Sequence, residues 1–318
     1  MPHPIRVGIS SCLLGDEVRY NGGHKLDLYL RDILGQFVEF VPVCPEAEVG
    51  MGIPREPVRL VGDVANPRLV GRESGKDWTQ QMLRWTDGRL KKLESFHLCG
   101  FVFKKGSPSS GMEKVRVYPD GGGQPLYSGR GFFAGRFMDH FPQLPVEDDG
   151  RLNDPGLREN FIERIFVMYR WLESTNDGPN MKALIEFHTR HKLLIMSHSV
   201  EAYRELGRLV AGHGKAVGIS RLFEQYSTIL FTNLQLKATP KKHRNVLQHC
   251  LGYFKKQITQ DEKQEMLHLI DQFVEKNIPL IVPMTLMNHF VRKYAEPYLA
   301  SQHYLSPHTL ELKLRNHV

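Results

Sequence analysis

The sequence predicts an α/β protein, with a Rossmann-like, mostly parallel sheet domain followed by an all-α helical bundle. Two observations support this fold class. In the first half of the chain, short apolar runs typical of strands alternate with helical stretches. In the second half, apolar residues recur at helical spacing and strand signals are nearly absent. We expect a sheet domain at residues 1–145, a linker at 146–160 and a helical domain at 161–318.

Length and composition are those of an ordinary globular protein. The chain has 318 residues, of which 41% are hydrophobic and 24% are charged, enough for two separate cores. It has no run of 18 apolar residues, and its start leads directly into a strand instead of a signal-peptide pattern. We therefore expect a cytoplasmic protein without a membrane segment, and we favour a monomer.

Three strands of the sheet domain are predicted to end in polar loops. Residues 5–9 run into Ser10-Ser11-Cys12, 38–43 run into Cys44-Pro45-Glu46, and 101–103 run into a loop of lysines, serines and glycines. Parallel strands in an open α/β sheet place their carboxyl ends at one edge, where ligands bind. The sequence therefore predicts that both cysteines, Glu46 and the serines of 107–110 meet at that edge.

The remaining elements of the sheet domain are short. The turn-rich residues 16–23 and the Gly- and Pro-rich residues 50–57 indicate loops over the sheet edge. Arg19, Asn21 and Arg55 in these loops could face a ligand. We further expect a helix at 26–34, edge strands at 58–60 and 69–70, a helix at 78–93 capped by Asp77 and weakened near Gly88, a strand at 115–118 and a helix at 129–140.

The second half carries the positive charge. Residues 1–150 hold 19 Lys and Arg and 19 Asp and Glu, whereas residues 151–318 hold 23 and 16, so the whole net charge of +7 lies there. Helices are expected from Phe161 through Tyr169 and at 184–194, 202–210, 223–236, 244–257, 261–276 and 286–294.

One stretch of the second half, residues 225–260, contains no Asp or Glu. A run of cations is often only a solvated face, but solubility favours mixed signs, and an acid-free surface suits phosphate contacts. His188 and His191 lie three apart without a Glu between them, which favours packing or backbone contact over a metal pair. The candidate phosphate-binding residues are Arg190, Lys192, Lys237, Lys241, Lys242, Arg244, Lys255 and Lys256.

The four cysteines are too few and too scattered for a disulfide scaffold. A structural zinc site would need paired Cys-x-x-Cys spacing, which does not occur. An iron–sulfur cluster can be held by single cysteines from separate loops. Cys12 and Cys44 are candidates because each follows a strand, whereas Cys99 and Cys250 are also readily explained as buried thiols.

These motifs carry a resemblance to a known family. Three of them, at 10–22, 43–46 and 104–111, resemble the thiouracil desulfidase (TudS) family in the same order, over about residues 5–130. Residues 239–249 and 278–286 resemble the YbgA-type helical domain. The joined architecture is similar to the tRNA 4-thiouridine desulfidases (RudS), which remove a thio-modification from tRNA and bind the RNA through the helical domain.

The resemblance implies a 4Fe–4S cluster on three cysteines. Cys12 and Cys44 match two of them, while the position of the third is Ser110 here. We favour Cys99 as the third ligand, and the Ser110 oxygen is the alternative. At about 3.3 Å per residue, a fully extended chain from Cys99 to the loop at Ser107 could span about 25 Å, so Cys99 reaches the cluster only if the strand is short or the chain folds back.

With such a cluster, we expect a mechanism without net electron transfer. The thiocarbonyl sulfur binds an open iron, water adds at the ring carbon, Glu46 acts as acid and base, and Ser107 hydrogen-bonds the base or the water. The products are uridine and sulfide, and the thiolated base must be accessible in the tRNA or turned out of its stack. The substrate-binding candidates are Arg19, Asn21, Arg55, Lys104 and Ser109.

Two other functions fit the sequence. One is a noncatalytic iron–sulfur protein that binds RNA and senses redox state, for which Glu46 would be dispensable. The other is a desulfidase of free thiolated bases, whose helical half would bind RNA only weakly and without steep salt dependence.

Overall fold

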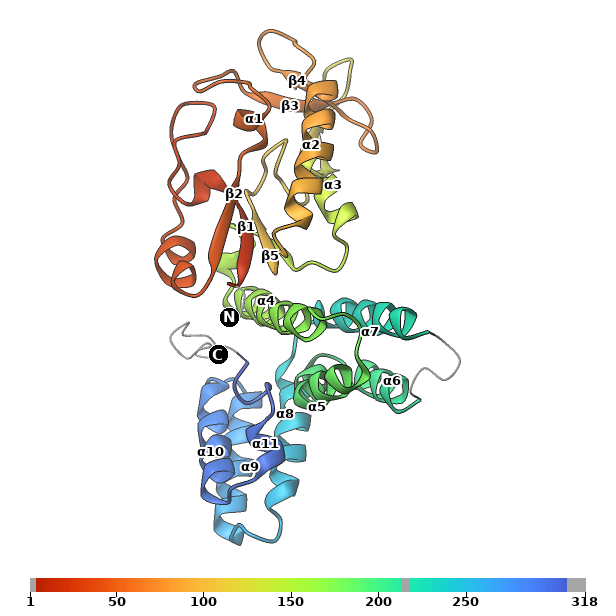
Figure 1. The fold of residues 1–318 in the computed structure, drawn as a ribbon. Coiled ribbons are helices and arrows are strands. Elements are labelled where there is room, and N and C mark those ends of the chain that lie inside the picture. The colour runs from red at the N-terminus through yellow and green to blue at the C-terminus, as the bar shows by residue number, and fades with distance from the viewer. Residues whose placement is uncertain (1–3, 213–217, 308–318) are drawn as a thin grey trace. The chain divides into compact units, whose positions relative to one another are not determined.

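The structure is a computed structural model that describes residues 4–212 and 218–307. The chain divides into two compact units, Met1–Asp154 and Pro155–Val318. Figure 1 shows an α/β first unit and a helical second unit, which confirms the predicted fold class. Within the described ranges, no helix is both long and apolar enough to cross a membrane.

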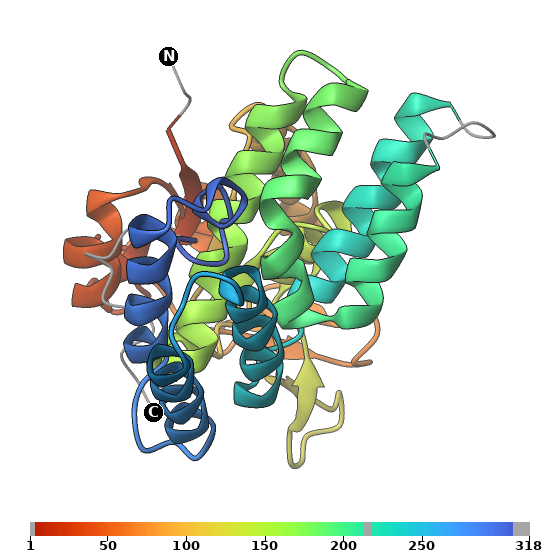
Figure 2. The same cartoon turned by 90° about the horizontal axis from the view of Figure 1, so that it is seen from below.

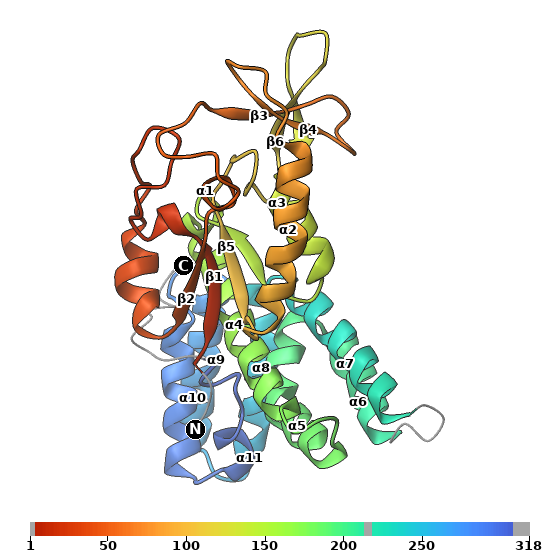
Figure 3. The same cartoon turned by 45° about the horizontal axis from the view of Figure 1, so that its top comes forward.

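The first unit is built on a parallel sheet with the strand order β2-β1-β5-β8 (Figure 3). Ser10 pairs with Val43, and Ile9 pairs with Val102, so the carboxyl ends of β1, β2 and β5 lie at one edge, as the sequence predicts. The strands are β1 (Arg6–Ser10), β2 (Glu39–Val43), β5 (Gly100–Phe103) and β8 (Val146–Asp148).

Aromatic side chains fill the core beside this sheet. Phe101 and Phe103 of β5 stack with ring centroids 4.4 Å apart, and Phe137 of α3 (Phe132–His140) packs 4.6 Å from Phe101. A Cβ on Gly8 would overlap the Phe101 ring, so β1 needs a glycine where this ring crosses it. This packing fixes β1, β5 and α3 relative to one another.

A second, mixed sheet has the order β4-β3-β6-β7 and lies beside the N-terminal part of α2 (Thr79–Glu94; Figures 1 and 3). The strands expected at 58–60, 69–70 and 115–118 are present, but they belong to this sheet, because Leu60, Leu69 and Val117 bury against Met82 in a core of their own. Its strands are β3 (Val58–Val61), β4 (Arg68–Gly71), β6 (Val115–Tyr118) and β7 (Leu126–Gly129).

The helices of the first unit differ from expectation in detail. The helix expected at 26–34 is a π turn, Tyr29–Ile33, followed by a 3-10 turn, Leu34–Gln36. α2 runs unbroken through Gly88. β7 lies within no predicted strand, because Leu126 and Tyr127 are exposed and lack the alternation of a half-buried strand.

The predicted linker at 146–160 is wrong. β8 is part of the parallel sheet, and the second unit begins at Pro155, where α4 starts. The acidic cluster that suggests a solvated segment is paired instead: Glu147 bonds Arg151, and Asp149 bonds Lys104. The acidic residues 147–149 therefore have the composition of a linker, but their carboxylates are paired and the segment belongs to the sheet.

The second unit is all-α in its described residues (Figures 1 and 2). Trp171 stacks on Tyr226 with ring centroids 5.5 Å apart and meets Phe187 edge-on, and Cys250 is fully buried in agreement with a structural role. The helices are α4 (Pro155–Thr175), α5 (Met181–His198), α6 (Val200–Ala211), α7 (Ile219–Leu234), α8 (Pro240–Leu251), α9 (Gln260–Val274), α10 (Ile281–Lys293) and α11 (Pro297–Ala300).

Candidate active site

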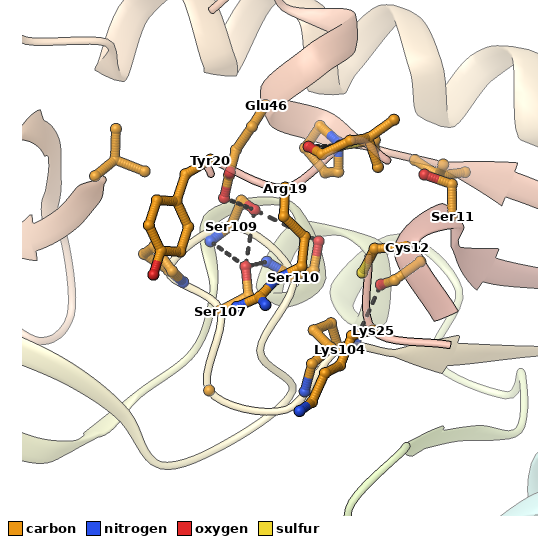
Figure 4. A pocket seen from close by; sticks show the side chains of 18 of the residues that line it. Ser11, Cys12, Arg19, Tyr20, Lys25, Glu46, Lys104, Ser107, Ser109 and Ser110 are labelled. Carbon is orange, nitrogen blue, oxygen red and sulfur yellow. Dashed lines mark hydrogen bonds between the residues drawn. The ribbon is translucent and has the colours of Figure 1, made fainter. Parts of the chain in front are cut away.

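A pocket of about 330 Å³ lies at the carboxyl edge of the parallel sheet (Figure 4). Its walls come from the segments that follow β1, β2 and β5, together with residues 18–25 and 55–58. The backbone N–H of Lys104 donates to Ser10 Oγ at 2.9 Å, which ties the loop after β5 to the end of β1. The sheet therefore assembles Cys12, Cys44, Glu46 and the serine loop in one pocket.

Cys12 and Cys44 are both held in sheltered positions. Cys12 lies in a 3-10 turn, Ser11–Leu13, and burial together with the nearby Cys44 raises the pKa of its thiol to about 11. Burial also raises the pKa of Cys44, which precedes α1 (Pro45–Glu48) and donates through Sγ to the carbonyl of Val18 at 3.8 Å. Both are thiols at neutral pH unless a metal displaces their protons.

Glu46 is fixed by partners on both carboxylate oxygens. Oε2 accepts from Nε of Arg55 at 3.2 Å and from its Nη2. Oε1 accepts from Ser109 Oγ at 2.8 Å. Arg55 also lines the pocket, and it is held by the carbonyls of Val18 and Gly52 as well as by Glu46.

The hydrogen bonds continue from Glu46 into the serine loop. Ser109 Oγ lies 3.0 Å from Ser107 Oγ, and Ser107 Oγ also accepts from the backbone N–H of Ser110 at 3.1 Å. The result is a continuous chain Glu46–Ser109–Ser107 (Figure 4). A proton can pass along such a chain between a carboxylate and a hydroxyl at the pocket wall.

The start of α3 holds this loop in place. The backbone N–H groups of Phe132 and Phe133 donate to the carbonyls of Pro108 and Ser109 at 3.0 and 2.9 Å. A Cβ on Gly131 would lie 2.7 Å from the Ser109 backbone, so the approach requires glycine. The helix therefore positions the serines by backbone contacts that do not depend on their side chains.

Cys99 lies at the other end of the sheet. It precedes β5, donates its N–H to the Arg6 carbonyl at 2.7 Å and is absent from the pocket wall. Four residues of strand separate it from Phe103 at the carboxyl edge, about 13 Å at 3.3 Å per residue. The structure does not bring Cys99 to Cys12 and Cys44, and this parallel register argues against the prediction that it is the third ligand.

Ser110 does lie in the pocket wall and is buried. Across residues 4–212 and 218–307, no three His, Cys, Asp or Glu side chains gather in an arrangement that would hold a metal ion. The pocket therefore offers two thiols and the Ser110 hydroxyl for an iron–sulfur cluster. This donor set fits a cluster with two sulfur bonds and one oxygen bond from the protein, and it does not fit three cysteines.

The other predicted substrate residues divide into two groups. Arg19 lines the pocket, and so does Lys104, although Nζ of Lys104 is 2.9 Å from Asp149 Oδ2. Asn21 does not line the pocket, because its side-chain oxygen accepts from the N–H of Gly23 and closes a turn. Its predicted ligand contact is therefore not supported.

Lys25 and Tyr20 line the pocket but are not among the site residues predicted from the sequence. Lys25 points into the same region as Lys104, and Tyr20 forms another part of the wall (Figure 4). The N–H of Lys25 donates to the Cys12 carbonyl at 2.9 Å, which draws residues 18–25 over the cysteine. The sequence around Lys25 does not predict this hydrogen bond, since the bond depends on how the loop folds back.

The predicted RNA-binding residues are spread over α5, the segment after α7, α8 and the segment after Phe254. Lys242 is occupied by the carbonyls of His198 and Lys237, and Arg244 pairs with Asp271 at 3.0 Å. Arg190 lies 3.8 Å from Glu186. His188 and His191 are buried, as packing predicts. The exposed members are Arg190, Lys237, Lys241, Lys255 and Lys256.

Comparison with known proteins gives the same division of the chain. Residues 7–149 match the 2-thiouracil desulfurase family, and YbbK of Bacillus subtilis (strain 168) is 32% identical over 108 residues. That match covers 32% of this chain and 71% of YbbK. A solved structure of a 4Fe-4S-dependent thiouracil desulfidase, TudS, is 27% identical and covers 47% of this chain and 94% of that chain. Its TM-score is 0.39, so the family relation rests on sequence.

The second unit matches a different family. Residues 192–309 match DUF1722, a family of unknown function. YbgA of Escherichia coli (strain K12) is 32% identical over 157 residues, which cover 49% of this chain and 93% of YbgA. The chain therefore belongs to the 2-thiouracil desulfurase family through its first unit and to the YbgA-like DUF1722 family through its second.

Proposed function

We propose that this protein removes sulfur from 4-thiouridine in tRNA by hydrolysis, in the cytoplasm. The thiocarbonyl group and one water become a carbonyl group and hydrogen sulfide, so no oxidant or reductant is consumed. The observation that carries the proposal is the joining of Cys12, Cys44 and the chain Glu46–Ser109–Ser107 in one pocket of a 2-thiouracil desulfurase domain.

The pocket residues have separate tasks in this reaction. Ser107 faces the substrate and orients the attacking water. The proton of the water moves through Ser107 and Ser109 to Glu46 Oε1, while Arg55 keeps Oε2 in place. Glu46 then returns a proton to a ring nitrogen or to the leaving sulfur. This is general acid–base catalysis by a carboxylate whose geometry is set in advance.

We infer that a 4Fe–4S cluster would bind beside the hydrogen-bonded residues Glu46, Ser109 and Ser107. Cys12 and Cys44 would supply two thiolates and Ser110 an oxygen, from the loops after β1, β2 and β5. Such a cluster, when bound, supplies a Lewis-acidic iron with affinity for the sulfur of the thiocarbonyl. Arg19 and Lys104 lower the pKa of Cys12 against the effect of burial, which favours the thiolate that metal binding requires.

Charge supports tRNA as the form of the substrate. Residues 151–318 carry the entire net charge of +7, as expected for a domain that binds a polyanion. A single polypeptide would then hold the RNA with one domain and process a base with the other.

One observation favours a free thiolated base as a second candidate. Every residue that lines the pocket belongs to the first unit, and the matched family is named for 2-thiouracil, a free base. The two candidates are separated by comparing 4-thiouracil, 4-thiouridine and thiolated tRNA at equal concentration.

The experiment begins with anaerobic reconstitution of the protein with iron and sulfide. The protein is incubated with bulk tRNA, and 4-thiouridine is quantified after digestion to nucleosides. We expect loss of 4-thiouridine with the unaltered protein and no loss with Cys12→Ala. Retention of all 4-thiouridine by a protein with a full cluster would contradict the proposal and favour a noncatalytic RNA-binding protein.

A further inference from the structure

α5 and α6 enclose an open groove on the second unit, with a volume of about 1100 Å³. Only Ser199 separates the two helices in the sequence, and the helices pack against each other. The groove is lined by His188 and Lys192 from α5, and by Tyr203, Arg204, Gly207 and Arg208 from α6, among others.

The cations of this groove are available to a ligand. Within the described part of the chain, no ion pair is found for Lys192, Arg204 or Arg208. Glu201 is the acidic residue of the lining. Three cations and one carboxylate give a positive hollow, which costs electrostatic energy unless an anion enters it.

His188 forms part of the groove floor and is 2% exposed. Its Nδ1 lies 3.0 Å from the Tyr226 hydroxyl, and its Nε2 has no hydrogen-bond partner among the described residues. Burial, together with the charge of Lys192, lowers the pKa of His188 to about 4, so the ring is neutral at pH 7.

The unpartnered ring nitrogen of His188, Nε2, is enclosed between α5 and α6. The buried Tyr226 hydroxyl bonds His188 Nδ1; if it is the donor there, the ring hydrogen is on Nε2. A Cβ at position 207 would lie 3.9 Å from Nε2, which is an ordinary contact distance, so α6 packs directly against this side of the ring.

We propose that the groove between α5 and α6 binds phosphate groups of the tRNA backbone, through Lys192, Arg204 and Arg208. The inference rests on the proposed function, because it names where the second unit holds the substrate. It adds Arg204 and Arg208 to the predicted contact at Lys192, whereas Lys242 and Arg244 already bond other parts of the protein. Tyr203 and Ile185 give the groove the apolar walls that suit ribose and base faces.

The test is tRNA binding by fluorescence anisotropy at several salt concentrations, with the full chain and an unmodified transcript. The transcript carries no 4-thiouridine, so binding is measured apart from catalysis. The groove variant combines Lys192→Gln, Arg204→Gln and Arg208→Gln. A charge-matched control combines Lys182→Gln, Lys263→Gln and Lys276→Gln, all exposed and outside the groove.

We expect the groove variant to bind at least about tenfold more weakly than the control at 0.15 M salt. Its slope of log K against log salt should be shallower by about 2 to 3, since each lost phosphate contact removes roughly 0.7 to 0.9. Equal affinities and equal slopes for the two triple variants would contradict the proposal that tRNA binds in the groove. Circular dichroism melting of both variants excludes unfolding as the cause.

Two further outcomes are distinguished by the same material. Failure of the unaltered protein to bind tRNA would overturn the tRNA substrate itself, whereas binding that is insensitive to the groove would overturn only the location. Inorganic phosphate is titrated calorimetrically into the unaltered protein. Tight phosphate binding that the groove variant loses, with no effect of that variant on tRNA, would assign the groove to a small anion and contradict the proposal.

Discussion

The pocket of the first unit pairs Glu46 and Lys104 with partners of opposite charge, whereas the groove of the second unit leaves its cations without ion pairs in the described residues. In the pocket, Glu46 is bound to Arg55 and Ser109, and Lys104 is bound to Asp149. In the groove, Lys192 and its two arginine neighbours have no ion pair within the described ranges. A reaction needs groups held in fixed geometry, whereas a polyanion is held by cations that are left open.

Removing a pocket thiol should have the largest effect on cluster binding and activity. Cys12→Ala should abolish both cluster binding and desulfidation, because one of the two sulfur donors is lost. Cys99→Ala is the matched control and should keep cluster and activity, since Cys99 lies at the amino end of β5. Iron content and visible absorbance after anaerobic reconstitution measure cluster binding in both variants, and loss of 4-thiouridine measures activity. A cluster lost equally in the two variants would mean that Cys99 is a ligand.

Glu46→Gln should lower kcat by about 10²- to 10³-fold while the cluster still binds. The amide keeps the size of the side chain but cannot accept a proton, and it weakens the bond to Arg55. Glu17→Gln, at an exposed carboxylate of the same unit, is the control. Unchanged kcat in Glu46→Gln would show that the chain from Glu46 to Ser107 has no catalytic role.

The burial of Cys12 predicts a pH dependence without any substrate. With its pKa raised to about 11, the apo protein should be alkylated there about a hundredfold more slowly at pH 8 than an ordinary thiol. The rate should rise until the pH passes about 11. The folded state favours the thiol, so stability from this group is present below pH 9 and falls as pH rises toward 11. Iodoacetamide labelling with peptide mass spectrometry measures the rate, and fast labelling at pH 7 would contradict the account.

Gly8→Ala should destabilise the first unit by about 1–3 kcal/mol, because a methyl group would overlap the Phe101 ring. Urea unfolding measures the loss. The double variant Gly8→Ala with Phe101→Leu should lose less than the sum of the two single variants. If the losses in unfolding free energy were additive, the Phe101 ring would not be in steric conflict with the added methyl group at position 8.

Ser110→Cys should give the smallest effect. It replaces the oxygen donor of the pocket with a sulfur donor and should lengthen the lifetime of a reconstituted cluster in air several-fold. Ser109→Cys is not equivalent, since Ser109 donates to Glu46. An unchanged lifetime and unchanged electron paramagnetic resonance spectrum in Ser110→Cys would show that position 110 does not contact the cluster.

The sequence predicts the pocket better than it predicts the boundaries around it. Cys12, Cys44 and Ser107 meet because strand ends share an edge in a parallel sheet, a rule that needs no coordinates. Cys99 could not be placed in the same way, since its distance from the edge depends on the register between β1 and β5. Register is set by tertiary packing, here by Gly8 and Phe101.

Pairing between distant residues is the other part that sequence reasoning lacks. The acids of 147–149 look like a solvated linker until Arg151 and Lys104 are seen beside them. The sequence places Arg55 in a loop over the sheet edge, but it does not predict that its guanidinium bonds Glu46. In the second unit, Lys242 and Arg244 belong to a run without acids, yet their partners come from elsewhere in the chain.

The most direct test of hydrolytic desulfidation uses water labelled with oxygen-18. Reconstituted protein is incubated anaerobically with thiolated tRNA, and uridine and sulfide are quantified by mass spectrometry and a sulfide assay, with Glu46→Gln in parallel. We predict one labelled oxygen in uridine and one sulfide for each 4-thiouridine lost, and little of either with Glu46→Gln. Loss of 4-thiouridine without label in uridine, or equal turnover in Glu46→Gln, would contradict the account.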